Sequence, residues 1–167
     1  MVTLRPVSPL DGHKEWQFIT AIPPETNGYR NSFSGQPESE FSDWIMSQVY
    51  RANAINLQDN QVPKISYWIE SEDKELIGFL KIRTRLTPSL LEQGGHIGYF
   101  ISPDYQGKGY GTQALTQGLK KAHLKGIDLV LVTCDADNLG SKRVIEKNGG
   151  LLCPTSTDTK LKFWIYN

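Results

Sequence analysis

The chain has 167 residues, of which 38% are hydrophobic, enough to bury one sizeable core but too few residues for two domains of usual size. Lysine plus arginine equals aspartate plus glutamate at 18 each, which excludes a basic field for nucleic acid. No run reaches the roughly 18 apolar residues of a membrane span, and the first ten residues contain no apolar signal core. We therefore expect one cytoplasmic domain over residues 1–167, with neither nucleic-acid nor membrane partners.

The first half of the chain predicts strand, helix, loop, helix and hairpin in that order. Residues 3–7 indicate an edge strand, where Pro6 is tolerated, and a first helix follows from Asp11. Prolines and glycines make residues 23–36 irregular, and Pro37 then opens a second helix. Residues 64–70 and 76–86 predict a hairpin, and residues 87–93 link it to the next strand.

The most informative segment is SPDYQGKGYGTQAL, residues 102–115. A β-prone run over residues 94–101 precedes it, and a helical pattern begins after its three alternating glycines. Glycine permits positive φ and close approach of the main chain to a ligand, while the free amides and dipole of a helix start favour an anion. The loop therefore predicts main-chain binding of a pyrophosphate, with a merely flexible turn as the alternative. Neither a Walker loop nor G-x-G-x-x-G fits, because no Ser or Thr follows Lys108 and Thr112 replaces the third glycine.

A second informative block, DADNLGSKRVIEKNGG, covers residues 135–150 and follows an apolar strand at residues 127–134. Asp137 or Asn138 can cap a short helix that stops at the glycine pair, and two strands are expected at 150–154 and 160–166. The order strand, Q-x-x-G-x-G, helix, strand and N-x-x-S with E-K-x-G-G resembles the GNAT superfamily of acetyl-CoA-dependent N-acetyltransferases, most clearly over residues 76–150. GGHIGYFISP, VTCDADN, VIEKNGG and FWI are similar to a bacterial branch of unassigned substrate.

The resemblance implies an α/β fold with a mixed, mostly antiparallel sheet of about seven strands, flanked by about four helices. Its two central parallel strands would splay apart, leaving main-chain groups free to bind pantetheine and to polarise the thioester carbonyl. It implies acetyl-CoA as cosubstrate and no metal. The residues that it assigns to the cofactor are Phe100, Ile101, Ser102, Gln106, Gly107, Lys108, Gly109, Tyr110, Gly111, Thr112, Asn138 and Ser141. A solvated Lys108, and helix capping by Asn138 and Ser141, are the alternatives.

The acceptor amine must be neutral when it attacks, which costs roughly 4 to 5 kcal/mol at neutral pH for a lysine side chain but only about 1 for an α-amine. His96 is the first candidate for the base because its unperturbed pKa lies near neutrality, and Glu92 is the second; a purely structural histidine is the alternative. Many GNAT enzymes protonate the leaving thiolate with a tyrosine, at the position that Ile145 occupies here. Tyr99 could serve instead, or the thiolate leaves unaided.

We expect direct acetyl transfer to a primary amine of a small molecule or peptide, with a non-catalytic acyl-CoA-binding sensor or interaction module as the alternative. Residues 23–36 and 87–93 would determine the acceptor, where Tyr29, Arg30, Phe33 and Arg85 could line a site or belong to surface loops. The two cysteines lack metal spacing and are expected to be reduced thiols outside the chemistry. A homodimer is compatible with this assignment.

Overall fold

The computed structural model describes residues 1–167, and its strands form two half-sheets and a small hairpin. The strands are β1 (Thr3–Pro6), β2 (Glu25–Thr26), β3 (Tyr29–Arg30), β4 (Lys64–Glu70), β5 (Leu76–Arg83), β6 (Ile97–Ile101), β7 (Leu129–Asp135), β8 (Leu151–Leu152) and β9 (Lys160–Tyr166). The larger half-sheet has the order β1-β4-β5-β6 and the smaller one β7-β9-β8, while β2 pairs only with β3. Every pairing within them is antiparallel.

Five α-helices flank the strands, four of them where the sequence predicts a helix. They are α1 (His13–Ala21), α2 (Phe41–Ala52), α3 (Pro88–Glu92), α4 (Tyr110–His123) and α5 (Leu139–Lys147). The additional helix, α3, lies in the segment expected to be a plain link. The Thr87 hydroxyl caps it by accepting the Leu90 N–H, and Pro88 stands in its first turn. A helix this short has no repeating apolar pattern, so its cap and proline were the available signals.

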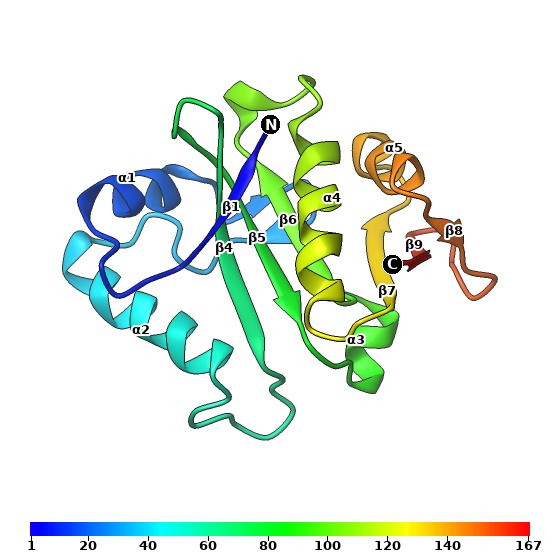
Figure 1. Ribbon diagram of the computed structural model, residues 1–167, viewed down its shortest axis with the longest axis horizontal. Helices are drawn as coiled ribbons and strands as arrows, with labels where there is room; N and C mark the ends of the chain where they lie inside the picture. Colours follow the sequence, from blue (N-terminus) through cyan, green and yellow to red (C-terminus); the bar gives the residue numbers. More distant parts are fainter.

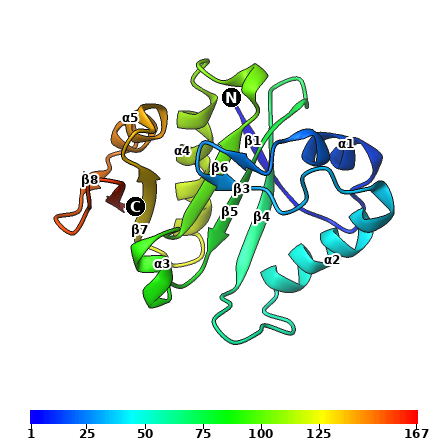
Figure 2. The ribbon, with the colours of Figure 1, turned by 180° about the vertical axis from the view of Figure 1, so that it is seen from behind.

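The larger half-sheet has helices on both faces (Figure 1). α4 packs against one face over a core of 20 buried residues, and α1 and α2 cover the other over a second core of 9. Figure 2 shows the β2–β3 hairpin lying across β6, on the face opposite α4. Along β5, Leu80 and Ile82 belong to the α4 core and Phe79 to the other. Because side chains alternate along a strand, Lys81 and Arg83 lie on the same face as Phe79 and the hairpin.

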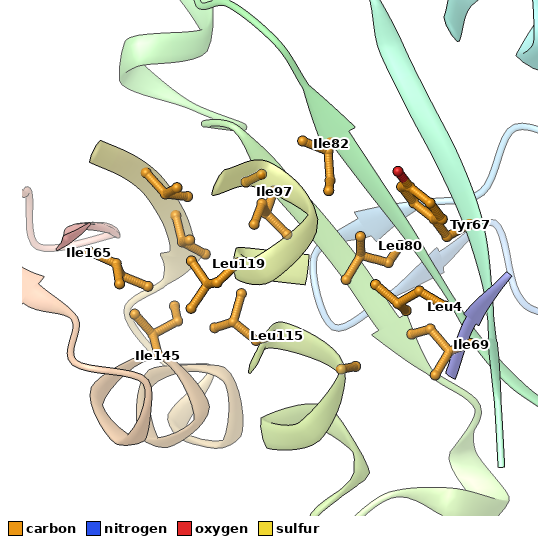
Figure 3. Packing of buried hydrophobic residues seen from close by; sticks show 14 of the residues in the cluster. Leu4, Tyr67, Ile69, Leu80, Ile82, Ile97, Leu115, Leu119, Ile145 and Ile165 are labelled. Carbon is orange, nitrogen blue, oxygen red and sulfur yellow. The ribbon is translucent and has the colours of Figure 1, made fainter. Parts of the chain in front are cut away.

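The central strands β6 and β7 are joined by the crossover helix α4, the connection typical of parallel neighbours, yet they belong to separate half-sheets. They meet near the start of β6, where the His96 N–H donates to the Leu131 carbonyl oxygen at 2.8 Å. Gly95 permits this approach, since a Cβ there would lie 2.4 Å from that oxygen. Beyond this contact the two strands separate, and Leu115 and Leu119 of α4 pack between Ile97 of β6 and Ile165 of β9 (Figure 3). The predicted splay, and the fold class that contains it, are confirmed.

Candidate active site

A pocket of about 400 Å³ opens where the loop before α4 meets the end of β6 and the start of α5. We call it the glycine-loop pocket. It is lined by Asn27, Tyr99, Phe100, Ile101, Tyr105, Gln106, Gly107, Gly109, Gly111, Thr112, Asn138, Gly140, Ser141, Arg143, Val144 and Lys147. Nine of the twelve residues that the sequence analysis assigned to the cofactor are among them. The other three, Ser102, Lys108 and Tyr110, do not line it.

A row of unpaired main-chain amides borders this pocket. None of the N–H groups of residues 107–112 donates a backbone hydrogen bond within the chain. Gly107 and Gly109 have φ of 74° and 82°, a left-handed conformation that glycine adopts without strain. Gly109 immediately precedes α4, and the first amides of a helix have no partner inside it. Such a row, at the positive end of a helix dipole, favours a bound anion.

The alternation of β6 decides which of its amides face the pocket. The Ser102 N–H donates to the Ile77 carbonyl oxygen of β5 at 2.8 Å, so the main-chain amide of Ser102 is already paired. Phe100 lies opposite Phe79 of β5 and has the same orientation as Ser102. The main-chain groups of the intervening Ile101 therefore point toward the opening beside β7. Among the amides of Phe100, Ile101 and Ser102, that of Ile101 has the orientation needed to polarise a carbonyl group in the opening.

Lys108 and Tyr110 contribute main chain rather than side chains to this region. Lys108 Nζ donates to the Asp104 carbonyl oxygen at 2.9 Å and lies 5.4 Å from the centre of the Tyr105 ring. The Tyr110 ring lies 6.1 Å from the same ring, centre to centre. These contacts brace the loop, while the two backbone amides remain in the unpaired row.

Positive side chains in the glycine-loop pocket come instead from α5. Arg143 and Lys147 line the pocket together with Gly140 and Val144, at the i, i+3, i+4 and i+7 positions of one helix face. The i, i+4 spacing of Arg143 and Lys147 is visible in the sequence and could have indicated a positive helix face at this site. Asn138 caps the helix by accepting the Ser141 N–H at 3.1 Å and also lines the pocket. Capping and pocket lining thus occur together.

A second pocket of about 320 Å³ lies between β6 and β7 beside the β2–β3 hairpin. We call it the strand pocket. Its lining is Asn27, Gly28, Tyr29, Arg30, Lys81, Arg83, Ser89, Gln93, Gly94, Ile97, Gly98, Tyr99, Val132, Thr133, Cys134, Asp135, Ser141 and Lys160. Asn27, Tyr99 and Ser141 line both pockets. The two pockets therefore meet at these three residues, which we call the junction.

The junction holds a protonated phenol, and a neutral thiol lies in the adjoining strand pocket. Tyr99 Oη lies 3.5 Å from Ser141 Oγ, and burial raises the pKa of Tyr99 to about 12. Burial also raises the pKa of the Cys134 thiol in the strand pocket, so little of it is the nucleophilic thiolate. Ile145 is 0% exposed and belongs to the core. At the junction the proton donor of suitable type is therefore Tyr99.

His96, the first candidate for the base, lines neither pocket. It is buried, and its Nδ1 accepts the Leu131 N–H at 2.9 Å. Burial, followed by the nearby Arg83 guanidinium, lowers its pKa. A neutral imidazole with a committed Nδ1 links β6 to β7, which is the structural role named as the alternative. A catalytic role for His96 stays a prediction.

Glu92, the second candidate, also lies outside both pockets. It ends α3, its side chain is 74% exposed, and Oε2 lies 3.0 Å from Lys162 Nζ. The carboxylate that does line the strand pocket is Asp135, at the end of β7, in an ion pair with Lys160. The sequence analysis did not single out Asp135, because a carboxylate after a strand also suits helix capping.

Four residues were considered for the acceptor side. Tyr29 and Arg30 line the strand pocket. Phe33 is 3% exposed and packs in the core under α1 and α2. Arg85 lines neither pocket, and its guanidinium donates to the Gln61 carbonyl oxygen at 3.4 Å. The first two thus reach the site, and the last two have structural positions.

The hairpin carrying Tyr29 turns tightly at Asn27 and Gly28, whose φ values are 49° and 80°. Positive φ at both central residues is the pattern of a type I′ hairpin, and Asn-Gly is its usual sequence. Asn138 Nδ2 donates to the Asn27 carbonyl oxygen at 3.1 Å, which ties the turn to the start of α5. The sequence analysis treated residues 23–36 as irregular and did not use the Asn-Gly signal.

No group of three or more His, Cys, Asp and Glu side chains is placed to hold a metal ion. No helix combines the length and the apolar character needed to cross a bilayer.

The split sheet, the amide-bordered loop at its opening and the joined pockets define the class of protein as an acetyltransferase fold. A family model described as an acetyltransferase (GNAT) domain matches residues 2–150. The chain belongs to this family.

Solved structures of low sequence identity share the fold. A probable acetyltransferase is 18% identical with a TM-score of 0.71, covering 99% of this chain and 92% of that one. Mutant forms of the spermidine/spermine N-acetyltransferase SpeG from Vibrio cholerae are 14% identical with a TM-score of 0.66, covering 99% and 95%. An acetyltransferase from Agrobacterium tumefaciens is 20% identical with a TM-score of 0.65, covering 99% and 91%. No curated protein matches the chain.

Proposed function

We propose that this protein transfers the acetyl group of acetyl-CoA directly to a primary amine of a small molecule or peptide. The observation that carries the proposal is the junction, where a pocket bordered by free amides opens into a second pocket at Asn27, Tyr99 and Ser141. In this proposal coenzyme A occupies the glycine-loop pocket and the amine enters the strand pocket. Membership of the acetyltransferase family supports the assignment.

The cofactor would be bound mainly by main chain. The unpaired amides of residues 107–112 suit the pyrophosphate, and Arg143 and Lys147 add positive charge along the same pocket. The Ile101 N–H, free at the edge of β6, would donate to the thioester carbonyl oxygen as negative charge develops on it. Acetyl-CoA supplies the activated acyl group, and the protein supplies its orientation.

We assign the departing thiolate a proton from Tyr99. The amine nitrogen bonds to the acyl carbon, the carbon–sulfur bond breaks, and the sulfur takes the phenolic proton. Tyr99 is protonated at neutral pH and lines both pockets. Tyr99 would thus take the part of the family's tyrosine, whose position is occupied by Ile145 in this chain.

The proton of the acceptor ammonium requires a separate base. His96 and Glu92 remain the candidates from the sequence, and Asp135 joins them because its carboxylate lines the strand pocket. Asp135 is paired with Lys160, so in this arrangement a water would carry the proton from the amine to its carboxylate. Comparing kcat for His96→Gln, Glu92→Gln and Asp135→Asn on one acceptor decides among the three.

The alternative function is a non-catalytic acyl-CoA sensor or interaction module, which the loss of the family tyrosine favours. A screen that follows thiol release from acetyl-CoA with small amines, peptides and spermidine, together with calorimetric titration of coenzyme A, separates the two. Binding with thiol release supports the enzyme. Binding without release on any acceptor supports the sensor, and absence of binding contradicts both. The same titrations can be followed by ultracentrifugation to test the homodimer; a SpeG from Vibrio cholerae is described as dodecameric.

A further inference from the structure

The strand pocket contains cations that no carboxylate neutralises. Lys81 and Arg83 from β5 and Arg30 from the hairpin all line it. None of the three takes part in any ion pair of the chain. The chain as a whole has equal numbers of acidic and basic residues, so this cluster does not follow from a general excess of positive charge.

The positive charge continues across the sheet. In the register of β4 and β5, Lys64 lies directly opposite Arg83, and like charges in that position repel. Burial, followed by Arg83, Lys64 and Arg51, lowers the pKa of Lys81 to about 7. Burial, followed by Arg51 and Arg83, lowers the pKa of Lys64 to about 8. The fold therefore gathers five cations, Arg30 included, at a cost in stability that no internal contact explains.

The partners of Lys81 and Arg83 inside the chain are neutral. Lys81 Nζ lies 4.4 Å from the centre of the Tyr29 ring. Arg83 Nη1 donates to the carbonyl oxygens of Gly94 and Gly95 at 3.3 and 3.1 Å. These contacts fix the direction of both side chains, and a bound anion would meet the Arg83 guanidinium and favour the charged form of Lys81.

The carboxylate of the strand pocket belongs to another strand and already has a partner. Asp135 ends β7 and pairs with Lys160 of β9, whereas Lys81 and Arg83 lie on β5. The β5 side of the pocket is thus positive, and the β7 side carries a neutralised pair.

We propose that the acceptor is an amine that also carries a carboxylate or phosphate group, which binds Lys81 and Arg83 while the amine lies at the junction. The inference rests on the proposed function. Lys81 lies opposite Gly98 and Arg83 opposite His96 in the β5–β6 register. Tyr99 is one to three residues further along β6, roughly 3 to 10 Å along the strand, and it lines the strand pocket from the other face of β6. A small amino acid or a short phosphorylated amine spans that distance.

The same arrangement disfavours polyamines. A polyamine would place additional ammonium groups among unpaired cations in a partly desolvated pocket, where like charges are repelled most strongly. The selectivity of this chain would therefore differ from that of the spermidine/spermine acetyltransferase whose fold it shares.

The first test uses matched acceptors with acetyl-CoA and the wild-type protein. β-Alanine is compared with its amide, phosphoethanolamine with ethanolamine, and both acids with spermidine. We expect kcat/KM about tenfold or more higher for at least one acid than for its neutral partner, the usual scale of a charge-assisted contact. The amide of an amino acid has the less basic amine and loses its proton more easily, so this preference cannot come from amine reactivity. The better of the two acids distinguishes carboxylate from phosphate.

Variants then locate the contact. Lys81→Gln and Arg83→Gln should each raise KM for the preferred acid about tenfold and lower the preference for the acid over its neutral partner, as a ratio of kcat/KM values, by a similar factor. Lys120→Gln, at an exposed position of α4, is the control and should match wild type.

A binding measurement separates failure of this inference from failure of the proposed function. 3-Hydroxypropionate has a carboxylate but no amine, and inorganic sulfate is avoided because it would also bind the glycine loop. The hydroxy acid should raise the melting temperature of the wild-type protein and not that of Lys81→Gln or Arg83→Gln. If the hydroxy acid has no effect and neutral or cationic amines are acetylated as well as the acids, the inference is wrong although the enzyme assignment holds. Stabilisation of the wild type alone, with no amine acetylated, supports the anion site and contradicts the proposed function.

Discussion

Replacing Lys81 by methionine should stabilise the protein in the absence of a bound anion. Methionine keeps the apolar stem beside Tyr29 and removes a charge that burial and three neighbouring cations disfavour. Lowering the pKa from 10.5 to about 7 corresponds to about 5 kcal/mol at ~1.4 kcal/mol per pKa unit. The side chain is only half-buried, and screening by water reduces this to on the order of 2 kcal/mol. Loss of the cation–π contact offsets about 1 kcal/mol, which leaves a net gain of about 1.

The pH dependence of this stability difference follows from the different pKa values of Lys81 in the folded and unfolded states. Below about pH 7 this lysine is protonated in both the folded and unfolded states, so the folded wild type bears the full cost of the buried charge. Between about 7 and 10.5 the folded amine is neutral while the unfolded one still binds a proton, and the cost shrinks as pH rises. The advantage of Lys81→Met should therefore be greatest near pH 6.5 and fall toward zero near pH 10.

Urea unfolding followed by circular dichroism at several pH values, in buffers without phosphate or carboxylate, measures this difference. Lys120→Met, on the exposed side of α4, should change the free energy of unfolding by less than about 0.5 kcal/mol at every pH. A Lys81→Met protein that is less stable than wild type at pH 6.5, or a difference that does not vary with pH, would refute the reasoning that Lys81 is a strained cation.

Four further predictions concern the site. Gly109→Ala, which puts a Cβ on a residue with φ of 82°, should weaken coenzyme A binding in calorimetry about tenfold or more, whereas Lys108→Ala should weaken it less than about threefold; equal effects would contradict main-chain binding. Tyr99→Phe should lower kcat about a hundredfold with the Kd for acetyl-CoA unchanged; an active variant would show that the thiolate leaves unaided. Cys134→Ala should retain activity, and mass spectrometry of the wild type after acetyl-CoA treatment should find no acetyl adduct on that residue. His96→Gln should lower the free energy of unfolding by about 1 to 3 kcal/mol through the lost acceptor for a buried N–H; unchanged stability with abolished kcat would instead support His96 as the base.

Much of the fold could be predicted from local sequence. β4 and β9 have the predicted bounds, and α5 begins after Asn138, one of its two predicted caps, whereas α4 begins at Tyr110, inside the glycine motif and not after it. These elements combine a clear apolar period with a distinct cap or turn. α3 and the β2–β3 hairpin were missed because each is short, and their only signals were the Thr87 cap and the Asn27–Gly28 turn.

The candidate site was only partly predictable for a different reason. The glycine loop is local, so a continuous segment of sequence carries its whole geometry. The strand pocket gathers side chains from β5, β6, β7, β9 and the hairpin, and no pattern along the chain indicates that Lys81, Arg83 and Tyr99 line one pocket. Likewise, His96 suits a base by residue type, but its contact with Leu131 exists only once two distant strands meet.

The sharing of Asn27, Tyr99 and Ser141 by the two pockets has a consequence for the choice of acyl donor. In the proposed function, the acyl chain and the incoming amine share the space beyond the thioester. Each methylene added to the acyl group would reduce the space left for the acceptor. The hydrogen bond from Asn138 to the Asn27 carbonyl oxygen holds the hairpin turn in place, so the cavity cannot widen by moving this turn away. Donor length and acceptor size are thus coupled: widening the junction by Ser141→Gly should extend the range of acyl groups and loosen the choice of amine together.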